Sequence, residues 1–375
     1  MSRAVFDVAV IGGGLHGLSI ALNLSRAGKR VVVLERAWVG RHASGATAAG
    51  VRTLNRDLGE LDLALESMDM WHNMEAIVGD DCGFNSHGTI CVAEGVANFC
   101  KLQDHVSQLH ALGYTHEEII DPQELRRLVP LISIECLGAS IARNDGAADP
   151  HRTLAAFRRS AQAAGAVIRE GFGVQRIERH GQDWLLDAGI EGVSPVVAPI
   201  VVNAAGAWSG RIAEMVGDDI PITTRASMMM VTERLAPMLK PVVSVLGRPL
   251  SFKQSDQGTL VIGGGLQGAS NLDLETANVR LGILAKGARA ATDVFSCVRD
   301  VRIVRTWAGL EAQTEDKLPI VGAAVNASGV FHAFGYSGHG FELIPVVGAA
   351  ITDLIVHGAT RRAIGKLTAA RLMSS

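Results

Sequence analysis

The sequence predicts a two-part α/β fold (α+β overall), with one unit built on a parallel sheet and the other on a mostly antiparallel sheet. Three observations predict it: an N-terminal strand–helix–strand pattern, short strands separated by turn residues in the middle, and a C-terminal return to strand–turn–helix. At 375 residues the chain exceeds the usual size of one domain. We expect the first unit to comprise 1–85, 146–218 and 300–375, and the second to comprise 86–145 and 219–299.

The first 36 residues carry the clearest motif. An apolar run ends at Gly12, a helical pattern covers 15–27, and a second apolar run ends at Glu35. Glycines at 12, 14 and 17 in this context are typical of the Rossmann-like unit that binds the ADP part of a dinucleotide. Gly12 permits the tight turn, Gly14 lets the backbone approach a pyrophosphate, and Gly17 lets the helix pack closely. Glu35 would accept hydrogen bonds from a ribose and repel a 2′-phosphate, which argues against NADP.

A second glycine motif with the same spacing, Gly263 to Gly268, tests whether this spacing alone indicates a nucleotide site. The residues after it, 269–276, form no apolar-faced helix and lead to no strand with an acidic end. We therefore interpret this copy as the end of a strand and its turn. Context, and not the glycine spacing alone, favours the first copy as a nucleotide site.

Two other stretches of small residues follow predicted strands. Residues 36–52 are rich in small residues and contain three arginines, and 203–209 join a buried strand predicted over 196–202 to a helix. Small side chains at so many positions favour backbone that lies against a bound group, and an ordinary surface loop is the alternative for the first stretch.

Composition excludes several classes of function. A hydrophobic content of 48% predicts an ample core, and a net charge of −3 gives no indication of nucleic-acid binding. The five cysteines form no CxxC pair and no metal-ligand spacing, so we expect reduced thiols, no metal or iron–sulfur cluster and a cytoplasmic location. The N-terminus carries no targeting pattern, and the apolar stretch 344–355 is too short and interrupted to span a membrane.

Some local patterns are assigned no chemistry. The periodicity over 61–78 predicts an amphipathic helix whose apolar stripe is core, and Asp121 and Asp149 are predicted helix caps. Three histidines at 105, 110 and 116 lie on or near polar helical stretches, so we expect them to be solvated.

Several stretches together carry a family resemblance: the opening unit, Ser44-Gly45, 203–208, 307–322 and 335–341. They resemble the D-amino-acid-oxidase-like FAD oxidoreductases, which include glycine and sarcosine oxidases. The strongest similarity is to the catalytic β subunits of multi-subunit amino acid dehydrogenases, such as those of sarcosine oxidase, L-proline/hydroxyproline dehydrogenase, hydrogen cyanide synthase and opine oxidase. The resemblance covers nearly the whole chain, in the same order.

The resemblance implies a noncovalent FAD that lies extended along the first unit. The implied contacts are Gly12, Gly14, Leu15, His16 and Gly17 to phosphate, Glu35 and Arg36 to ribose, Val174 to adenine, Ala205, Gly206 and Trp208 to the diphosphate, and Ser44, Ala48, Ala49, Gly50, Val51, Gly309, Gly338, His339, Gly340 and Phe341 along the flavin half. The last four would begin a helix whose positive end stabilises the reduced flavin.

The activity implied by the resemblance is oxidation of the C–N bond of an amino acid or secondary amine by hydride transfer to flavin N5. Proline or hydroxyproline, N-methyl amino acids and opine-like compounds are the expected substrates. The chain would act as the catalytic subunit of a dehydrogenase complex whose partner subunits carry electron-transfer centres. The alternatives are an O₂-using glycine or D-amino acid oxidase, a non-catalytic FAD-binding subunit and an NAD-dependent dehydrogenase.

Three residues are candidates for catalysis. Arg52, four residues before Arg56, is the first choice to anchor a substrate carboxylate, because a guanidinium pairs with it through two hydrogen bonds. Glu311 stands where glycine oxidases carry an arginine, so we expect it to meet a cationic part of the substrate, and an ion pair with Arg305 is the alternative. His339 lies in the flavin-facing turn.

A second flavin is a separate question. The β chain of sarcosine oxidase attaches FMN covalently to a histidine before a helix that begins here near Pro150, and the matching position is Asp149, with His151 displaced. We therefore expect no covalent flavin, and a noncovalent FMN at a subunit interface stays open.

Overall fold

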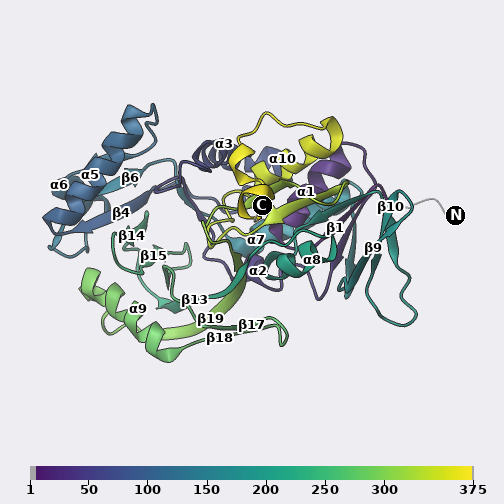
Figure 1. Ribbon diagram of the computed structural model, residues 1–375. Coiled ribbons are helices and arrows are strands. Elements are labelled where there is room, and N and C mark those ends of the chain that lie inside the picture. Colours follow the sequence, from purple (N-terminus) through teal and green to yellow (C-terminus); the bar gives the residue numbers. More distant parts are fainter. Residues whose placement is uncertain (1–5, 374–375) are drawn as a thin grey trace.

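The computed structural model describes residues 6–373 and contains two large sheets that lie side by side (Figure 1). The first sheet has six strands in the order β20-β21-β12-β1-β2-β8. Neighbouring strands are parallel except for β20 and β21. Its strands are β1 (Val8–Ile11), β2 (Val31–Glu35), β8 (Val167–Glu170), β12 (Ile200–Asn203), β20 (Ile320–Ala323) and β21 (Val330–Phe334).

Both faces of this sheet are covered. Alternate side chains of β1 and β2 pack under the helices α1 (Leu15–Arg26), α7 (Pro150–Ala163) and α10 (Ile344–His357). The remaining side chains pack against α8 (Ser209–Met215) and a three-stranded sheet of β9 (Arg176–His180), β10 (Asp183–Asp187) and β11 (Val196–Ala198). Burial on both faces explains the continuous apolar runs of β1 and β2.

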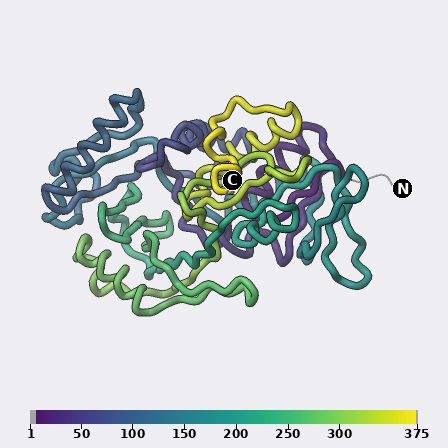
Figure 2. Tube along the Cα trace, viewed as in Figure 1, coloured from purple at the N-terminus to yellow at the C-terminus, as the bar shows by residue number. Residues whose placement is uncertain are grey.

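Helices from opposite ends of the sequence meet on this sheet. The purple N-terminal chain and the yellow C-terminal chain occupy the same half of the molecule (Figure 2). Helices α1 and α10 pack so closely that a Cβ added at Gly348 would lie 2.1 Å from Ser19 Oγ. The C-terminal helix therefore belongs to the core that supports the first glycine turn.

The second sheet has eight strands in the order β19-β13-β16-β15-β14-β4-β6-β5. Every pairing is antiparallel except that of β14 with β4. The strands are β4 (Thr89–Glu94), β5 (Glu118–Ile120), β6 (Cys136–Ala142), β13 (Thr223–Arg234), β14 (Val242–Val245), β15 (Ser251–Gln254), β16 (Thr259–Gly263) and β19 (Ile303–Gln313). Helices α6 (Pro122–Leu128) and α9 (Leu281–Val294) share its main core, and α5 (Val96–Ala111) packs against the other side of β4 and β6.

Short elements connect these layers. The ribbon β3 (Gly50–Val51) pairs with β7 (Gly146–Ala147), and β17 (Ala269–Asn271) forms a hairpin with β18 (Thr276–Asn278). The remaining helices are α2 (Ala43–Ala46), α3 (Leu61–His72) and α4 (Met74–Val78), with 3-10 turns at Gly206–Trp208, Ser296–Val298, Gly365–Leu367 and Ala369–Leu372.

The structure corrects three predicted elements. The helix expected over 61–78 is interrupted at Asn73, and the helix expected from Gly340 begins at Ile344. The strand expected over 196–202 is two strands, because Pro199 has no N–H to continue the ladder. The second glycine motif ends β16 and leads into a hairpin, as predicted.

Strand β19 departs from the division into units expected from the sequence. It lies within 300–375, which the sequence assigns to the first unit, yet it pairs along its length with β13 of the second sheet. The other seven strands of that sheet come from 86–145 and 219–299. We propose that the units divide as predicted, with β19 transferred to the second.

Candidate active site

The turn after β1 depends on glycine at two positions. Gly12 has a φ of +111°, and a Cβ there would lie 2.3 Å from the carbonyl oxygen of Ala204. A Cβ at Gly17 would lie 2.0 Å from the carbonyl oxygen of Gly12. Gly14 precedes the helix with no side-chain cap, and the first N–H of α1, that of Leu15, donates to Ser44 Oγ at 2.9 Å. The next N–H groups lack helical acceptors and suit a phosphate.

A cavity with about 1150 Å³ of empty space, part of it open to solvent, lies against this turn. Eleven of the residues predicted to contact the cofactor line it: Gly12, Gly14, Leu15, His16, Glu35, Arg36, Ser44, Val174, Ala205, Gly206 and Trp208. Sequence reasoning did not single out other lining residues, notably His42, Phe172, Gln175 and Tyr336. His42 and Tyr336 lie in or beside stretches that carry the family resemblance, but a lone His or Tyr in a small-residue loop gives no signal of its own.

Four side chains that line the cavity carry buried polar atoms with no hydrogen-bond partner in the described region. These atoms are His16 Nδ1, His42 Nε2, Trp208 Nε1 and Tyr336 Oη. Leaving such an atom unpaired costs about 1–3 kcal/mol, so native proteins rarely tolerate several together. A polar ligand would satisfy them. The glycine turn, the helix N-terminus and these atoms therefore fit a bound dinucleotide.

Two predicted ribose contacts differ in their surroundings. Glu35 is buried at the cavity wall, where its carboxylate accepts hydrogen bonds from the backbone N–H groups of Gly13 (2.7 Å) and Ala37 (2.9 Å). Burial raises the pKa of Glu35. Arg36 forms an ion pair with Glu275 at 2.7 Å, and its guanidinium lies over the Trp208 ring. The hairpin of β17 and β18 thus contacts the cavity edge.

The predicted flavin-side residues 48–51 do not line that cavity. Ala49 has a φ of +54°, and Gly50 and Val51 form the ribbon with β7. The preceding helix α2 contacts β19, where Trp307 Nε1 donates to the Ala46 carbonyl at 2.8 Å and a Cβ at Gly309 would lie 2.7 Å from Ala46 Cβ. Gly309 and Ala46 line a second cavity, with about 530 Å³ of empty space including space open to solvent. Residues 43–51 therefore lie between the two sheets.

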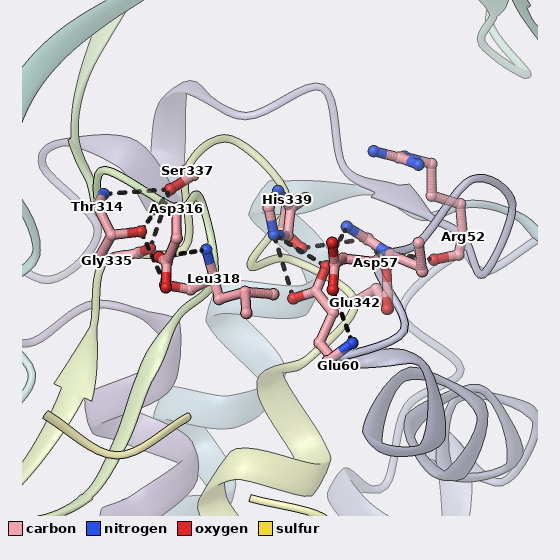
Figure 3. Close-up of polar contacts among 12 residues, drawn as sticks. Arg52, Asp57, Glu60, Thr314, Asp316, Leu318, Gly335, Ser337, His339 and Glu342 are labelled. Atoms are coloured by element: carbon pink, nitrogen blue, oxygen red, sulfur yellow. Dashed lines mark hydrogen bonds and ion pairs between the residues drawn. The ribbon is translucent and has the colours of Figure 1, made fainter. Parts of the chain in front are cut away.

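The turn before α10 is held by several contacts. Gly338 has a φ of +90°, and a Cβ on Gly340 would lie 2.5 Å from the Tyr336 ring. Phe341 stacks on Trp71 with centroids 5.3 Å apart. Ser337 Oγ accepts a hydrogen bond from the backbone N–H of Thr314, beyond the end of β19 (Figure 3). Both sheets thus support the predicted flavin-facing turn.

Arg52 and Arg56 have different partners. Arg56 is buried and forms ion pairs with Glu342 and, at 3.5 Å, with Glu60. Arg52 has no carboxylate within 4 Å in the described chain, and its guanidinium donates one hydrogen bond, to the Leu54 carbonyl at 2.5 Å. In Figure 3 no dashed line joins its guanidinium to the Glu60–His339–Glu342 cluster.

His339 belongs to this charged cluster. Its Nε2 lies 3.1 Å from Glu60, and its backbone carbonyl accepts a hydrogen bond from Arg56. Burial and the neighbouring Arg56 lower the pKa of His339, so its ring is neutral at pH 7. Burial opposes ionisation of Glu60, but His339 and Arg56 lower the pKa of that carboxyl overall. His339 is therefore a neutral donor to Glu60.

Glu311 projects toward the same turn from β19. Ser227 Oγ donates a hydrogen bond to its carboxylate, and an ideal Cβ on Gly338 would lie 3.6 Å from it. Burial raises the pKa of Glu311. The ion pair with Arg305 that the sequence left open is not formed within 4 Å, so among residues 6–373 this carboxylate has no cationic partner at that distance.

The three histidines expected to be solvated lie around Glu117; His110 is exposed, and His105 and His116 are partly exposed. The carboxylate lies 3.5 Å from the Nε2 atoms of His105 and His116, and His110 Nε2 donates to its backbone carbonyl at 2.9 Å. Glu117 is fully buried, and none of its sequence neighbours indicates that. Within the described chain there is no cluster suited to a metal ion and no helix long and apolar enough to cross a bilayer.

Comparison with known proteins places this geometry in a family. A family model described as FAD dependent oxidoreductase matches residues 7–354. The chain is 27% identical to the B subunit of opine oxidase from Rhizobium meliloti, over 95% of this chain and 97% of that protein. It is 24% identical to the beta subunit of sarcosine oxidase from Rhodobacter capsulatus, over 94% and 85%.

The fold also matches a solved structure over its length. The crystal structure of L-proline dehydrogenase from P. horikoshii superposes with a TM-score of 0.89 at 25% identity, covering 98% of this chain and 97% of that one. Together with the family match, this agreement identifies the chain as a member of the FAD-dependent oxidoreductase family that acts on amino acids or amines.

Proposed function

We propose that this protein oxidises the C–N bond of an amino acid or secondary amine that carries a carboxylate. The observation that carries the proposal is two charged side chains near the turn Gly338–His339: Glu311 faces Gly338, and the charge of Arg52 contributes to the lowered pKa of His339. Arg52 contributes a cation with no ion-pair partner within 4 Å in the described chain, and Glu311 contributes a carboxylate that is likewise unpaired. A substrate with an anionic carboxylate and a cationic amine matches these two charges.

The chain supplies binding and orientation for this reaction. When bound, FAD would supply the acceptor for the two electrons and the hydrogen of the substrate C–H bond; the cationic amine must first release a proton to solvent, and the product is then an iminium ion. Arg52 would hold the carboxylate through two hydrogen bonds and fix the position of the neighbouring carbon. Glu311 would accept a hydrogen bond from the amine. His339 and Glu60 would hold the turn, because their hydrogen bond joins it to α3.

The cofactor would be held noncovalently. The proposed contacts are those of the large cavity, with residues 48–51, Gly309 and 338–341 on the flavin side. Asp149, which replaces the flavin-linked histidine of the sarcosine oxidase β chain, accepts hydrogen bonds from the N–H groups of His151 and Arg152 and so caps α7. We propose that no flavin is attached there. Acid precipitation should leave the protein pellet colourless, and a yellow pellet would contradict this.

Partner subunits are the remaining part of the proposal. Two of the similar proteins are named as subunits, of opine oxidase and of sarcosine oxidase, which supports a role as the catalytic subunit of a complex. We propose a partner subunit that accepts the electrons, and FMN bound at the subunit interface is one candidate for the accepting group. Turnover with an artificial acceptor and little peroxide would support a dehydrogenase, whereas stoichiometric peroxide would support an oxidase.

The decisive experiment is anaerobic reduction of the FAD-loaded protein. We expect proline, hydroxyproline, sarcosine, glycine, D-amino acids or opines to bleach the flavin band. The matched variant is Arg52→Ala, which should raise the half-saturating concentration of the active substrate by about 100-fold, as loss of a bidentate charged contact predicts. No bleaching by any compound would favour the non-catalytic alternative.

A further inference from the structure

Two buried carboxylates hold the backbone that directly follows Arg52. Asp145 accepts hydrogen bonds from Thr53 N (2.8 Å), Thr53 Oγ1 (2.7 Å) and Leu54 N (3.0 Å). Glu117 accepts from Asn55 N at 2.7 Å. Three consecutive N–H groups are thus bound by two side chains that are 0% and 1% exposed. Hydrogen bonds to charged acceptors are roughly twice as strong as neutral ones, so this segment is held firmly.

Packing fixes the same segment from a second direction. The Leu54 side chain is buried with Cys91, Ala93, Leu102 and Ala142, between α5 and the strands β4 and β6. Asn55 adopts the left-handed conformation with a φ of +55°, which asparagine tolerates better than most residues. The buried Leu54 side chain and the two carboxylates therefore hold the segment in one conformation.

The two carboxylates act on the Arg52 guanidinium from a distance. Burial lowers the pKa of Arg52, and the charges of Asp145, Glu60 and Glu117 oppose that shift. These charges offset the cost of burying a cation, yet none of their oxygens lies within 4 Å of the guanidinium. Both oxygens of Asp145 and Oε1 of Glu117 accept backbone N–H groups, and Glu60 contacts Arg56 and His339. Most of its five N–H donors stay available to a ligand.

Arg56 shows the alternative outcome four residues later. Its guanidinium contacts Glu342 and Glu60 directly, so its donors are consumed inside the protein. The two arginines lie on one loop, near the same buried carboxylates.

We infer that Asp145 and Glu117 are positioning residues that hold Arg52 as a preformed anchor for the carboxylate of the substrate. This inference rests on the proposed function, because it takes Arg52 to be the anchor. It predicts that substrate affinity depends on two groups from the second unit and its boundary, which contact neither substrate nor cofactor. The maximal rate of flavin reduction should not depend on them.

The test measures acetate binding to the FAD-loaded protein, followed by the change in flavin absorbance. Glu117→Ala removes the acceptor of Asn55 N and should weaken acetate binding by about 10-fold or more. Glu117→Gln keeps an oxygen acceptor and removes only the charge, so binding should stay within about 3-fold of the parent protein. The matched control is Glu118→Ala, because the neighbouring Glu118 is exposed and bonds only to Arg143 among residues of the structure.

The outcomes separate this inference from the proposed function. If Arg52→Ala leaves acetate binding unchanged, the anchor is elsewhere and both fail. If Arg52→Ala weakens binding but Glu117→Ala does not, the positioning role alone is overturned. Should Glu117→Ala not load FAD, Asp145→Asn serves instead, because it retains an acceptor for Thr53 and loses the one for Leu54. It should raise the half-saturating substrate concentration and leave the limiting reduction rate unchanged, and the opposite pattern would contradict the inference.

Discussion

The imidazole of His16 stacks face to face on the ring of Tyr336, with centroids 3.8 Å apart and planes 7° apart. Its Nε2 donates a hydrogen bond to the Gly340 carbonyl at 2.9 Å. Because a carbonyl only accepts, the proton is on Nε2, and the unprotonated Nδ1 can accept from a hydroxyl but not from a phosphate. The first turn of α1 is therefore joined to the turn before α10 at the wall of the large cavity.

Tyr336→Phe tests whether the cavity is built for a ligand. The Tyr336 hydroxyl is buried without a hydrogen-bond partner in the described residues, and burial raises its pKa well above the usual value. Removing it should stabilise the apoprotein by about 1 kcal/mol in urea unfolding and weaken FAD binding several-fold. Tyr336→Ala, which also removes the stacked ring, should destabilise by about 3 kcal/mol. Loss of stability in Tyr336→Phe would show that the hydroxyl has a protein partner.

The stability of the apoprotein should fall as the solution becomes acidic. Burial lowers the pKa of His16 from 6.5 to about 3. Between these pKa values the unfolded chain binds a proton at His16 that the folded chain does not bind. The contribution of His16 to the free energy of unfolding is therefore lost as pH falls from 6.5 toward 3, with a limiting slope of about 1.4 kcal/mol per pH unit. Urea unfolding of His16→Asn at several pH values should show a shallower slope. His357→Asn, at an exposed position, should keep the parental slope.

The first sheet was predictable because its signals are local. The apolar runs of β1 and β2, the glycines between them and the cap Asp149 of α7 each act within a few residues. These signals also separated the glycine motif at Gly12, which lines the cavity, from its copy at Gly263, which ends β16. The sequence assigned strand β19 to the first unit, because no residue within the strand indicates that it pairs with β13.

The candidate site was predictable from the sequence only where a position requires one particular type of residue. Glycines and other small residues indicated the cavity, since few residue types allow the backbone to lie close to a bound group. Arg52 and Arg56 have the same local context, and their difference comes from Glu342, which lies 286 residues from Arg56. The same is true of Arg36, whose partner Glu275 belongs to a hairpin of the second unit. Long-range ion pairs leave no periodic trace in a sequence.

Gly17→Ala should damage the cofactor site more than an ordinary helix substitution. Alanine normally stabilises a helix relative to glycine by up to about 1 kcal/mol. At this position its Cβ would lie 2.0 Å from the backbone oxygen of Gly12, so α1 must move away from the turn. We expect a loss of about 1–3 kcal/mol in stability and at least a 10-fold weaker FAD affinity by fluorescence titration. Gly282→Ala in α9, where the Cβ meets nothing within 4 Å, is the control and should not weaken FAD binding.

Glu311→Gln tests whether the buried carboxylate on β19 meets a cationic group of the substrate. The substitution preserves shape and an acceptor for Ser227, whose hydroxyl in turn accepts from Gln267 at 3.1 Å, so it removes little besides the charge. If the amine pairs with the carboxylate, KM should rise about 10- to 100-fold, the range for loss of a charged hydrogen bond. Because burial raises the pKa of Glu311, the parent protein should show a similar rise in KM as pH falls through that pKa, and Glu311→Gln should not. Ser227→Ala keeps the charge and should change KM much less. An unchanged KM in Glu311→Gln across this pH range would remove Glu311 from the substrate site and leave Arg52 as the sole proposed charged contact.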